Sequence, residues 1–376
     1  MSPGSLVDAR ELHHGSHAGL LQDEELPTGA PAGLDAIIVP TAWPVDALRH
    51  VMQVGTAIGC PVVALCSRDA SAERARKLAE HEEAAVLAVD VDQPLARKLP
   101  AFATDRRLRE AGFGSTSDLS LKRNLGLVLA RGSGWQRVLF LDDDIHIDDP
   151  QHLHRAAGLV DNYRAVGLAN HGYADNSVVC HAYREVGGAQ STFIGGGAMI
   201  VDTFRTRSFY PNIYNEDWFF LLGDGIPFRA ARAGAMRQRT YDPFANPGRA
   251  AAEELGDTLA EGLFWLLETG SPDAVAESAY WGDALYRRRR FIDLVIDLVG
   301  DGPEGERMRR ALVAARGRSA AITHRLCQSF VELWQADLAR WRAYLDEVPV
   351  SSSPEKFLHE VAMTDHVHTS TAFRDR

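Results

Sequence analysis

The sequence contains few cysteines and no long apolar run. The four cysteines (60, 66, 180 and 327) include no pair at the two-residue spacing of a zinc knuckle or a redox CxxC motif. We therefore expect buried thiols in a reducing compartment. No apolar run approaches the roughly 20 residues that span a bilayer, and the start of the chain lacks the basic and then apolar pattern of a signal peptide. These absences predict a cytoplasmic protein without a membrane span.

Basic charge is also scarce. The 376 residues carry 51 acidic and 40 basic side chains, a formal net charge of −11. A nucleic-acid-binding domain would need a clustered basic face. The one dense basic run, RRRR at 287–290, lies in a helical pattern, where a solvated helix face is expected. The sequence argues against nucleic acid as a partner, and an anionic ligand would need a local cation.

The segment from 34 to 144 alternates apolar runs with amphipathic stretches. Such alternation predicts a parallel sheet with crossover helices. Strands are expected at 34–40, 60–67, 84–92 and 136–144, and helices at 45–59, 71–82 and, from Ser117 or Asp118, to Gly132. The stretch 94–118 is predicted to be irregular apart from that helix start.

After residue 144 the sequence pattern changes twice, first to short strands and a loop and then to helices. Short strands are expected at 164–172 and 195–203, followed by a loop with Pro and Gly at 241–252. We therefore divide the chain into a flexible segment at 1–33, an α/β domain at 34–252, an α-helical subdomain at 253–348 and a polar, mobile tail at 349–376.

One helical pattern in the C-terminal part carries an apolar stripe. Ile322, Phe330, Trp341 and other apolar residues recur every three or four positions between 322 and 345. The stripe is expected to pack on neighbouring helices. A homodimer contact through these helices is the alternative.

Three consecutive aspartates follow the most apolar strand. VLFL at 138–141 runs directly into Asp142, Asp143 and Asp144. Ligands collect at the carboxyl ends of strands in open parallel sheets. Carboxylate oxygens two residues apart suit Mg²⁺ or Mn²⁺, and a dication would relieve their repulsion. The alternative is a solvated acidic turn.

The order of motifs resembles a known family. VPTAWP, LSLKRNLGLVLARG, FLDDDI, FIGGGAMIVD and NEDWFF succeed one another between residues 34 and 230. Together they resemble the DxD-containing, family-2-like glycosyltransferases of the GT-A fold, which use nucleotide-sugars. The resemblance implies an α/β, Rossmann-like, mostly parallel sheet flanked by helices, with nucleotide-binding residues in 34–148 and the acceptor side in 149–252. It also implies a hexosyltransferase-type enzyme that moves sugar from a nucleotide-diphospho-sugar to a small-molecule or glycan hydroxyl.

Carried over by motif, the resemblance assigns the donor site. Asp142 and Asp144 would hold Mn²⁺ or Mg²⁺ at the diphosphate, with Asp143 near the ribose or sugar. Arg123 would contact the diphosphate or base, although a helix-surface role is equally open. The remaining donor-binding residues implied are Pro40, Thr41, Trp43, Asp69, Gly196 and Gly197.

The acceptor side is assigned from NEDWFF. Asp217 is the candidate general base and Glu216 the second, because an inverting enzyme needs an acid here to take the acceptor proton. Asn or Asp before acids is equally typical of a helix start. Trp218 would stack on a sugar or fill core. His146 is expected to be structural or to contact the acceptor.

The third metal ligand is left open by the sequence, because no histidine lies between His181 and His324. Asp257 is a candidate for that role or for the acceptor site. A solvated helix face shared with Glu254 and Glu261 explains its position more simply. The alternative functions are a sugar-nucleotide binding module without turnover, a sugar-phosphate nucleotidyltransferase, whose Gly-rich triphosphate loop is absent here, and a phosphatase with an aspartate nucleophile.

Overall fold

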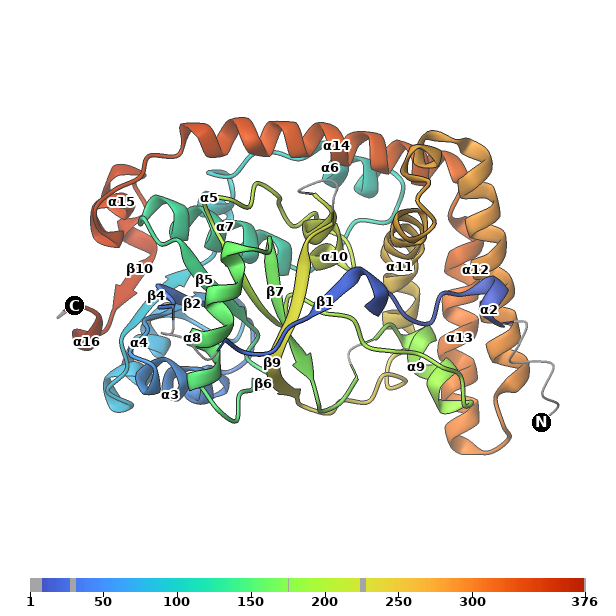
Figure 1. Cartoon of the computed structure of the whole chain (residues 1–376), viewed down its shortest axis with the longest axis horizontal. Helices are drawn as coiled ribbons and strands as arrows, with labels where there is room; N and C mark the ends of the chain where they lie inside the picture. Colours follow the sequence, from blue (N-terminus) through green and yellow to red (C-terminus); the bar gives the residue numbers. More distant parts are fainter. Residues whose placement is uncertain (1–8, 28–31, 175, 224–227, 375–376) are drawn as a thin grey trace.

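A computed structural model describes residues 9–27, 32–174, 176–223 and 228–374. Within them the strands form one mixed, mostly parallel ten-stranded sheet in the order β1-β9-β7-β8-β5-β2-β3-β4-β10, with β6 paired to β9 (Figure 1). The strands are β1 (Leu21–Asp23), β2 (Ala36–Thr41), β3 (Val62–Cys66), β4 (Val86–Asp90), β5 (Arg137–Leu141), β6 (Ile145–His146), β7 (Ala165–Asn170), β8 (Ala198–Asp202), β9 (Ala230–Gln238) and β10 (Val367–Thr369).

The predicted parallel strands are confirmed. β5, β2, β3 and β4 are neighbours and pair in parallel. All six residues of β2 are buried, as expected for a strand covered on both faces. Successive side chains point to opposite faces of a strand, so Ile37 and Ile38 enter different core clusters.

One central strand runs against its neighbours. β8 lies between β5 and β7 and is antiparallel to both. The pairing places Leu141, the last residue of β5, opposite Ala198, the first of β8. The aspartates after β5 and the glycines before β8 therefore meet at one edge of the sheet, where the backbone N–H of Asp142 donates to the carbonyl of Gly197 at 2.8 Å.

Helices flank this sheet, and α11, α12 and α13 form a group at one end of the molecule, while α14 crosses above the sheet (Figure 1). The α-helices are α2 (Ala9–Leu12), α3 (Arg49–Ala57), α4 (Ala72–His81), α5 (Gln93–Ala96), α6 (Ala103–Glu110), α7 (Leu119–Gly132), α8 (Gln151–Ala157), α9 (Val178–Glu185), α10 (Glu216–Leu222), α11 (Pro247–Glu268), α12 (Ser278–Leu298), α13 (Pro303–Ala321), α14 (His324–Glu347), α15 (Pro354–Glu360) and α16 (Thr371–Arg374). The 3₁₀ turns are η1 (Ala18–Leu20), η2 (Val45–Leu48), η3 (Gly158–Asp161), η4 (Pro272–Ala276) and η5 (Thr364–His366).

Two stretches predicted as irregular contain helices. α5 and α6 lie within 94–118 or begin just before it, and α11 starts inside the expected loop 241–252. Pro247 occupies the first turn of α11, where a missing N–H costs nothing, and the Asn246 side chain accepts from the Gly248 N–H at 2.9 Å. These residues start a helix rather than prevent one.

Both ends of the chain are more structured than predicted. In the N-terminal segment β1 pairs with β9, and His13 and His17 are buried. In the C-terminal segment β10 pairs with β4, and Phe357 is fully buried beside Gly132. Residues 9–27 and 349–374, where a flexible segment and a mobile tail were expected, therefore each contribute a strand and buried apolar side chains.

The apolar stripe of α14 is buried within the chain. α14 contacts α6 and α12, and Trp341 lies with no exposed surface near Phe102 and Phe209. The predicted packing on neighbouring elements is confirmed, and a dimer contact through this stripe is not supported. No helix in the described ranges combines the length and apolar character needed to cross a bilayer.

Candidate functional site

The three aspartates after β5 have separate partners. Asp142 faces Arg123. Asp143 accepts a hydrogen bond from the Thr41 hydroxyl at 2.6 Å. The Asp144 carboxylate lies 3.5 Å from the Gln238 amide, a long contact that leaves its oxygens available to a ligand. Three like charges therefore share one turn, each oriented by a different strand or helix.

Arg123 joins two of the predicted motifs. It comes from α7, and only 2% of its side chain is exposed. Nη2 donates to both carboxylate oxygens of Asp142, at 3.0 and 2.9 Å, and Nη1 donates to Glu216 at the start of α10. Burial disfavours the guanidinium charge, but the carboxylates of Asp142 and Glu216 outweigh it and raise the pKa of Arg123. The sequence left open a helix-surface role for Arg123, and that reading is wrong.

The glycines before β8 make this arrangement possible. A Cβ on Gly196 would lie 2.4 Å from Arg123 Nη1, and one on Gly195 would lie 2.8 Å from Asp217 Oδ2. Neither glycine has a positive φ. Close approach of charged side chains therefore explains these glycines, rather than an unusual backbone conformation.

Asp217 is fixed by backbone donors. The Gly196 N–H donates to Oδ2 at 2.6 Å, and the Trp218 N–H donates to Oδ1 at 2.9 Å. The preceding Asn215 has a φ of 62° and makes no side-chain cap; its amide instead donates to Asp257 at 3.2 Å. The alternative prediction, that the Asn215 side chain caps the helix, is therefore wrong.

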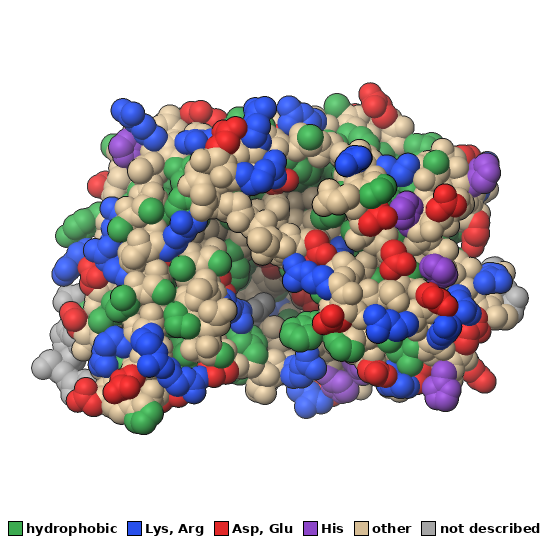
Figure 2. All heavy atoms as spheres, turned by 180° about the vertical axis from the view of Figure 1, so that it is seen from behind, with side chains coloured by type: hydrophobic (Ala, Val, Ile, Leu, Met, Phe, Trp, Pro, Cys, Tyr) green, Lys and Arg blue, Asp and Glu red, His purple; other side chains and the backbone are tan. Residues whose placement is uncertain are grey.

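Arg123, Asp142 and Asp217 line one cavity of about 180 Å³. Its walls come from segments far apart in the sequence, and the molecular surface is hollowed near the centre of the face in Figure 2. The cavity-lining residues with polar or aromatic side chains are Arg123, Asp142, Asn176, Ser177, Cys180, Gln190, Phe193, Tyr214, Asn215, Glu216, Asp217, Trp218, Asp257 and Glu261. The fold thus brings the KRN, DDD, GGG and NEDW motifs to one place.

Burial raises the pKa of several carboxyl groups in the site. It raises the pKa of Asp142 to about 6, with Asp144 adding to the rise and Arg123 opposing it. Burial also raises the pKa of Asp143 and of Glu216. The cavity therefore holds acidic groups whose charged forms need a cation, and Arg123 supplies one.

The expected nucleotide contacts lie apart from the cavity lining. Thr41 and Pro40 are buried at the end of β2, whereas Trp43 is 60% exposed and Asp69 is exposed after β3. Lys122 is buried beneath them, where its Nζ donates to the Thr41 carbonyl at 2.8 Å and to Ser67 at 2.7 Å. Lys122 was not among the predicted site residues, because the adjacent Arg123 was the better-placed basic residue of the KRN motif.

His146 lies outside this cavity lining. Its ring stacks on that of His50 at 4.0 Å, and its Nε2 lies 3.3 Å from Asp148. β6, which carries it, pairs with β9. These contacts favour the structural reading of His146 over acceptor contact.

The predicted solvated face of α11 is buried instead. Glu254 and Asp257 are 0% and 3% exposed, and both pair with Arg288 of α12, whose Nη2 lies 2.6 Å from Asp257 Oδ2. The basic run 287–290 is therefore not simply a solvated face either. Acidic side chains of α11 pair with a basic side chain of α12. The periodicity of one helix cannot reveal such pairing between two helices.

Trp218 lines the cavity and packs on an aromatic cluster. Its ring meets those of Phe193 and Phe264 edge-on, at centroid distances of 5.2 and 4.8 Å. Core filling is thus confirmed for one side of the ring. Cys180 and Gln190 complete this wall, and the sequence carried no motif that marked them.

Comparison with known proteins finds likeness among solved structures. No protein-family model matches the chain, and no curated protein does. The fold is similar to that of a mannosyltransferase from Pyrobaculum calidifontis, solved in complex with GDP-Man and Mn²⁺, with 14% sequence identity and a TM-score of 0.43. The match covers 95% of this chain and 99% of that one.

The donor set at the end of β5 fits a hard divalent cation. Asp142 and Asp144 offer carboxylate oxygens, the ligands that Mg²⁺ and Mn²⁺ prefer. Within the described ranges, the groups of three ligand atoms near one another do not include these aspartates. A cation here would therefore need further oxygens from a bound phosphate or water.

Proposed function

We propose that the protein is a metal-dependent glycosyltransferase that moves a sugar from a nucleotide-diphospho-sugar to a hydroxyl on a small-molecule or glycan acceptor. The observation that carries this proposal is the Arg123 bridge between Asp142 and Glu216, with Gly196 pressed against it. The bridge supports a GT-A-type site, because it joins four of the five motifs of the resemblance around one cavity.

Asp142 and Asp144 would hold Mn²⁺ or Mg²⁺ together with the donor diphosphate. Bound there, the dication stabilises the negative charge that develops on the leaving diphosphate. Burial and the neighbouring Asp144 raise the pKa of Asp142, so the cation must compete with a proton at this carboxyl below about pH 6. Arg123 orients Asp142 through both oxygens.

Asp217 would act as the general base toward the acceptor hydroxyl. Two backbone N–H groups fix its carboxylate, and it lines the cavity. Glu216 is the weaker candidate, because it is 8% exposed and already pairs with Arg123. Trp218 and Asp257, in the same lining, would bound the acceptor.

The nucleotide would lie toward the ends of β2 and β3. The exposed Trp43 ring offers a stacking surface for the base. Pro40 and Thr41 precede it in the sequence, and the Asp69 N–H donates to the carbonyl of the adjacent Ala42 at 3.3 Å. The Thr41 hydroxyl holds Asp143 at 2.6 Å, which orients this carboxylate for the ribose or sugar. Gly196 and Gly197 would lie below the donor sugar, with Arg123 against the position of the missing Gly196 Cβ.

Binding and hydrolysis of UDP-, GDP- and dTDP-sugars with Mn²⁺ test the proposal. We expect one donor class to bind in a metal-dependent way, Asp144→Ala to lose that binding, and Asp217→Asn to keep it while losing transfer. Asp149→Ala, an exposed acid beyond the motif, is the matched control and should behave as the parent protein. Binding without hydrolysis or transfer would instead favour a binding module, and no donor binding would refute the proposal.

A further inference from the structure

A second group of metal-ligating side chains lies where the N-terminal segment crosses α11. The sequence HHGSH at 13–17 follows α2, and two of its histidines meet acids of α11. His14 Nδ1 and His17 Nδ1 lie 3.0 and 3.2 Å from the same oxygen, Glu268 Oε2. The side chains of this group come from two segments, 14–17 and α11, that lie some 250 residues apart in the sequence and are brought together by the fold.

The three facing atoms are buried and have no partners but one another. His14 Nδ1, His17 Nδ1 and Glu268 Oε2 are inaccessible to solvent and face one another as ion pairs, without a further partner in hydrogen-bond geometry among the described residues. The His17 side chain is only 2% exposed. Buried polar atoms without a hydrogen bond are rare and call for an explanation, and a bound ion is one.

The other nitrogen of His17 has the partner that a metal-bound histidine needs. His17 Nε2 lies 2.9 Å from Glu261 Oε2. A metal-ligating imidazole almost always donates its second N–H to a carboxylate or carbonyl, which fixes the tautomer and leaves the first nitrogen free for the metal. Glu261 thus orients Nδ1 of His17 toward Glu268.

We propose that His14 Nδ1, His17 Nδ1 and Glu268 Oε2 form a site for a divalent transition metal of the Zn²⁺ class, with Glu261 orienting His17. Two imidazole nitrogens and one carboxylate oxygen suit Zn²⁺ better than Mg²⁺. The His14 side chain is 41% exposed although its Nδ1 is covered, so the group lies near the protein surface and a metal could enter from the side of His14.

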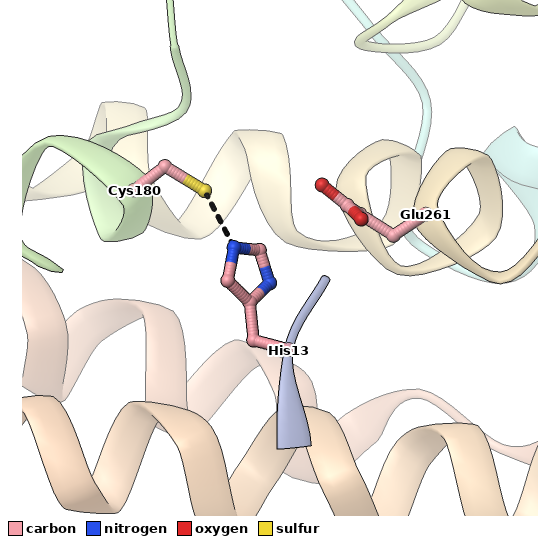
Figure 3. A group of neighbouring side chains, drawn as sticks. All are labelled: His13, Cys180 and Glu261. Carbon is pink, nitrogen blue, oxygen red and sulfur yellow. Dashed lines mark hydrogen bonds between the residues drawn. The ribbon is translucent and has the colours of Figure 1, made fainter. Parts of the chain in front are cut away.

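A neighbouring group is a weaker candidate. His13, Cys180 and Glu261 also lie close together, with His13 Nε2 4.0 Å from the Cys180 sulfur (Figure 3). That nitrogen is already paired with Gln190 Oε1 at 2.6 Å. Burial also raises the pKa of the Cys180 thiol well above its ordinary value, so the thiolate that a metal needs is disfavoured.

The proposed metal would brace the cavity described above. His17 meets the Trp218 ring edge-on at 5.4 Å, and Glu261 and Trp218 both line the cavity. A metal at His17 would fasten the N-terminal segment to α11 on this side. It would act independently of any cation at Asp142 and Asp144, because the two sites share no ligand.

Co²⁺ titration of the metal-free, full-length Asp144→Ala protein tests this site apart from the first one. We expect one equivalent of Co²⁺ to bind with visible absorption bands and to be displaced by Zn²⁺. His14→Ala and Glu268→Gln should each weaken binding at least about tenfold. His81→Ala is the control, an exposed histidine on α4 at the opposite end of the molecule (Figure 1), and should leave binding unchanged.

Limited trypsin digestion at Arg10 gives a second readout that does not depend on colour. We expect Zn²⁺ to slow cleavage of the parent protein and of His81→Ala, but not of His14→Ala. Co²⁺ binding that is absent, or unchanged in both ligand variants, would overturn the proposal. Equal cleavage with Zn²⁺ and with chelator would also overturn it, because a His17 imidazolium paired with Glu261 and Glu268 would then hold the segment alone.

Discussion

Substituting Gly196 by Ala tests the packing at the centre of the site. The added Cβ would lie 2.4 Å from Arg123 Nη1 and 2.5 Å from Cζ. Carbon contacts are favourable near 3.5 Å, so the guanidinium must move by about 1 Å. That shift breaks the geometry of its bonds to Asp142 and Glu216, and overpacking alone costs about 1–3 kcal/mol.

Gly197→Ala is the matched control. Its Cβ would lie 3.5 Å from Asp142 Oδ2, an ordinary contact, and neither glycine has a positive φ. Urea unfolding followed by circular dichroism should give a loss of about 2 kcal/mol or more for Gly196→Ala and less than about 1 kcal/mol for Gly197→Ala. Equal free energies of unfolding in the two variants would refute the close approach of Arg123.

Three further predictions concern charge and packing. Burial raises the pKa of Asp142 in the folded state to about 6 from an ordinary 3.8, so the native state holds the extra proton and the free energy of unfolding should fall as pH rises from about 4 to about 6. Asp142→Asn should remove this part of the pH dependence of stability, and an unchanged pH dependence would contradict the raised pKa. Arg288→Ala leaves Glu254 and Asp257 buried without their cation and should cost about 3–5 kcal/mol in urea unfolding; a loss below 1 kcal/mol would mean that the pair is solvated. Trp341→Ala should cost about 3–5 kcal/mol, whereas the 60% exposed Trp43→Ala should change stability by less than about 0.5 kcal/mol yet weaken donor binding.

Apolar patterning predicted the part of the fold that positions the site. β2, β3, β4 and β5 each contain a run of consecutive apolar residues, and such runs mark strands covered on both faces. The aspartates after β5 could then be placed at a sheet edge. The direction of β8 was not predictable in this way, because strand orientation depends on long-range pairing rather than on local pattern.

Charged residues misled the sequence interpretation where they pair across the fold. Glu254 and Arg288 each read as part of a solvated helix face, and each is buried against the other. The histidines at 13–17 read as a flexible lead-in because their partners on α11 lie far away in the sequence. Arg123 likewise gave no sign that Asp142 and Glu216 both depend on it.

The proposed function depends on Asp142 and Asp144 binding a divalent cation together with a nucleotide-sugar. The most direct test is calorimetric titration of UDP-, GDP- and dTDP-sugars into the protein with Mn²⁺ and with chelator, in the parent chain and in Asp144→Ala. We expect one donor to bind the parent chain only when Mn²⁺ is present and not to bind Asp144→Ala. Donor binding of equal affinity in chelator, or in Asp144→Ala, would contradict it.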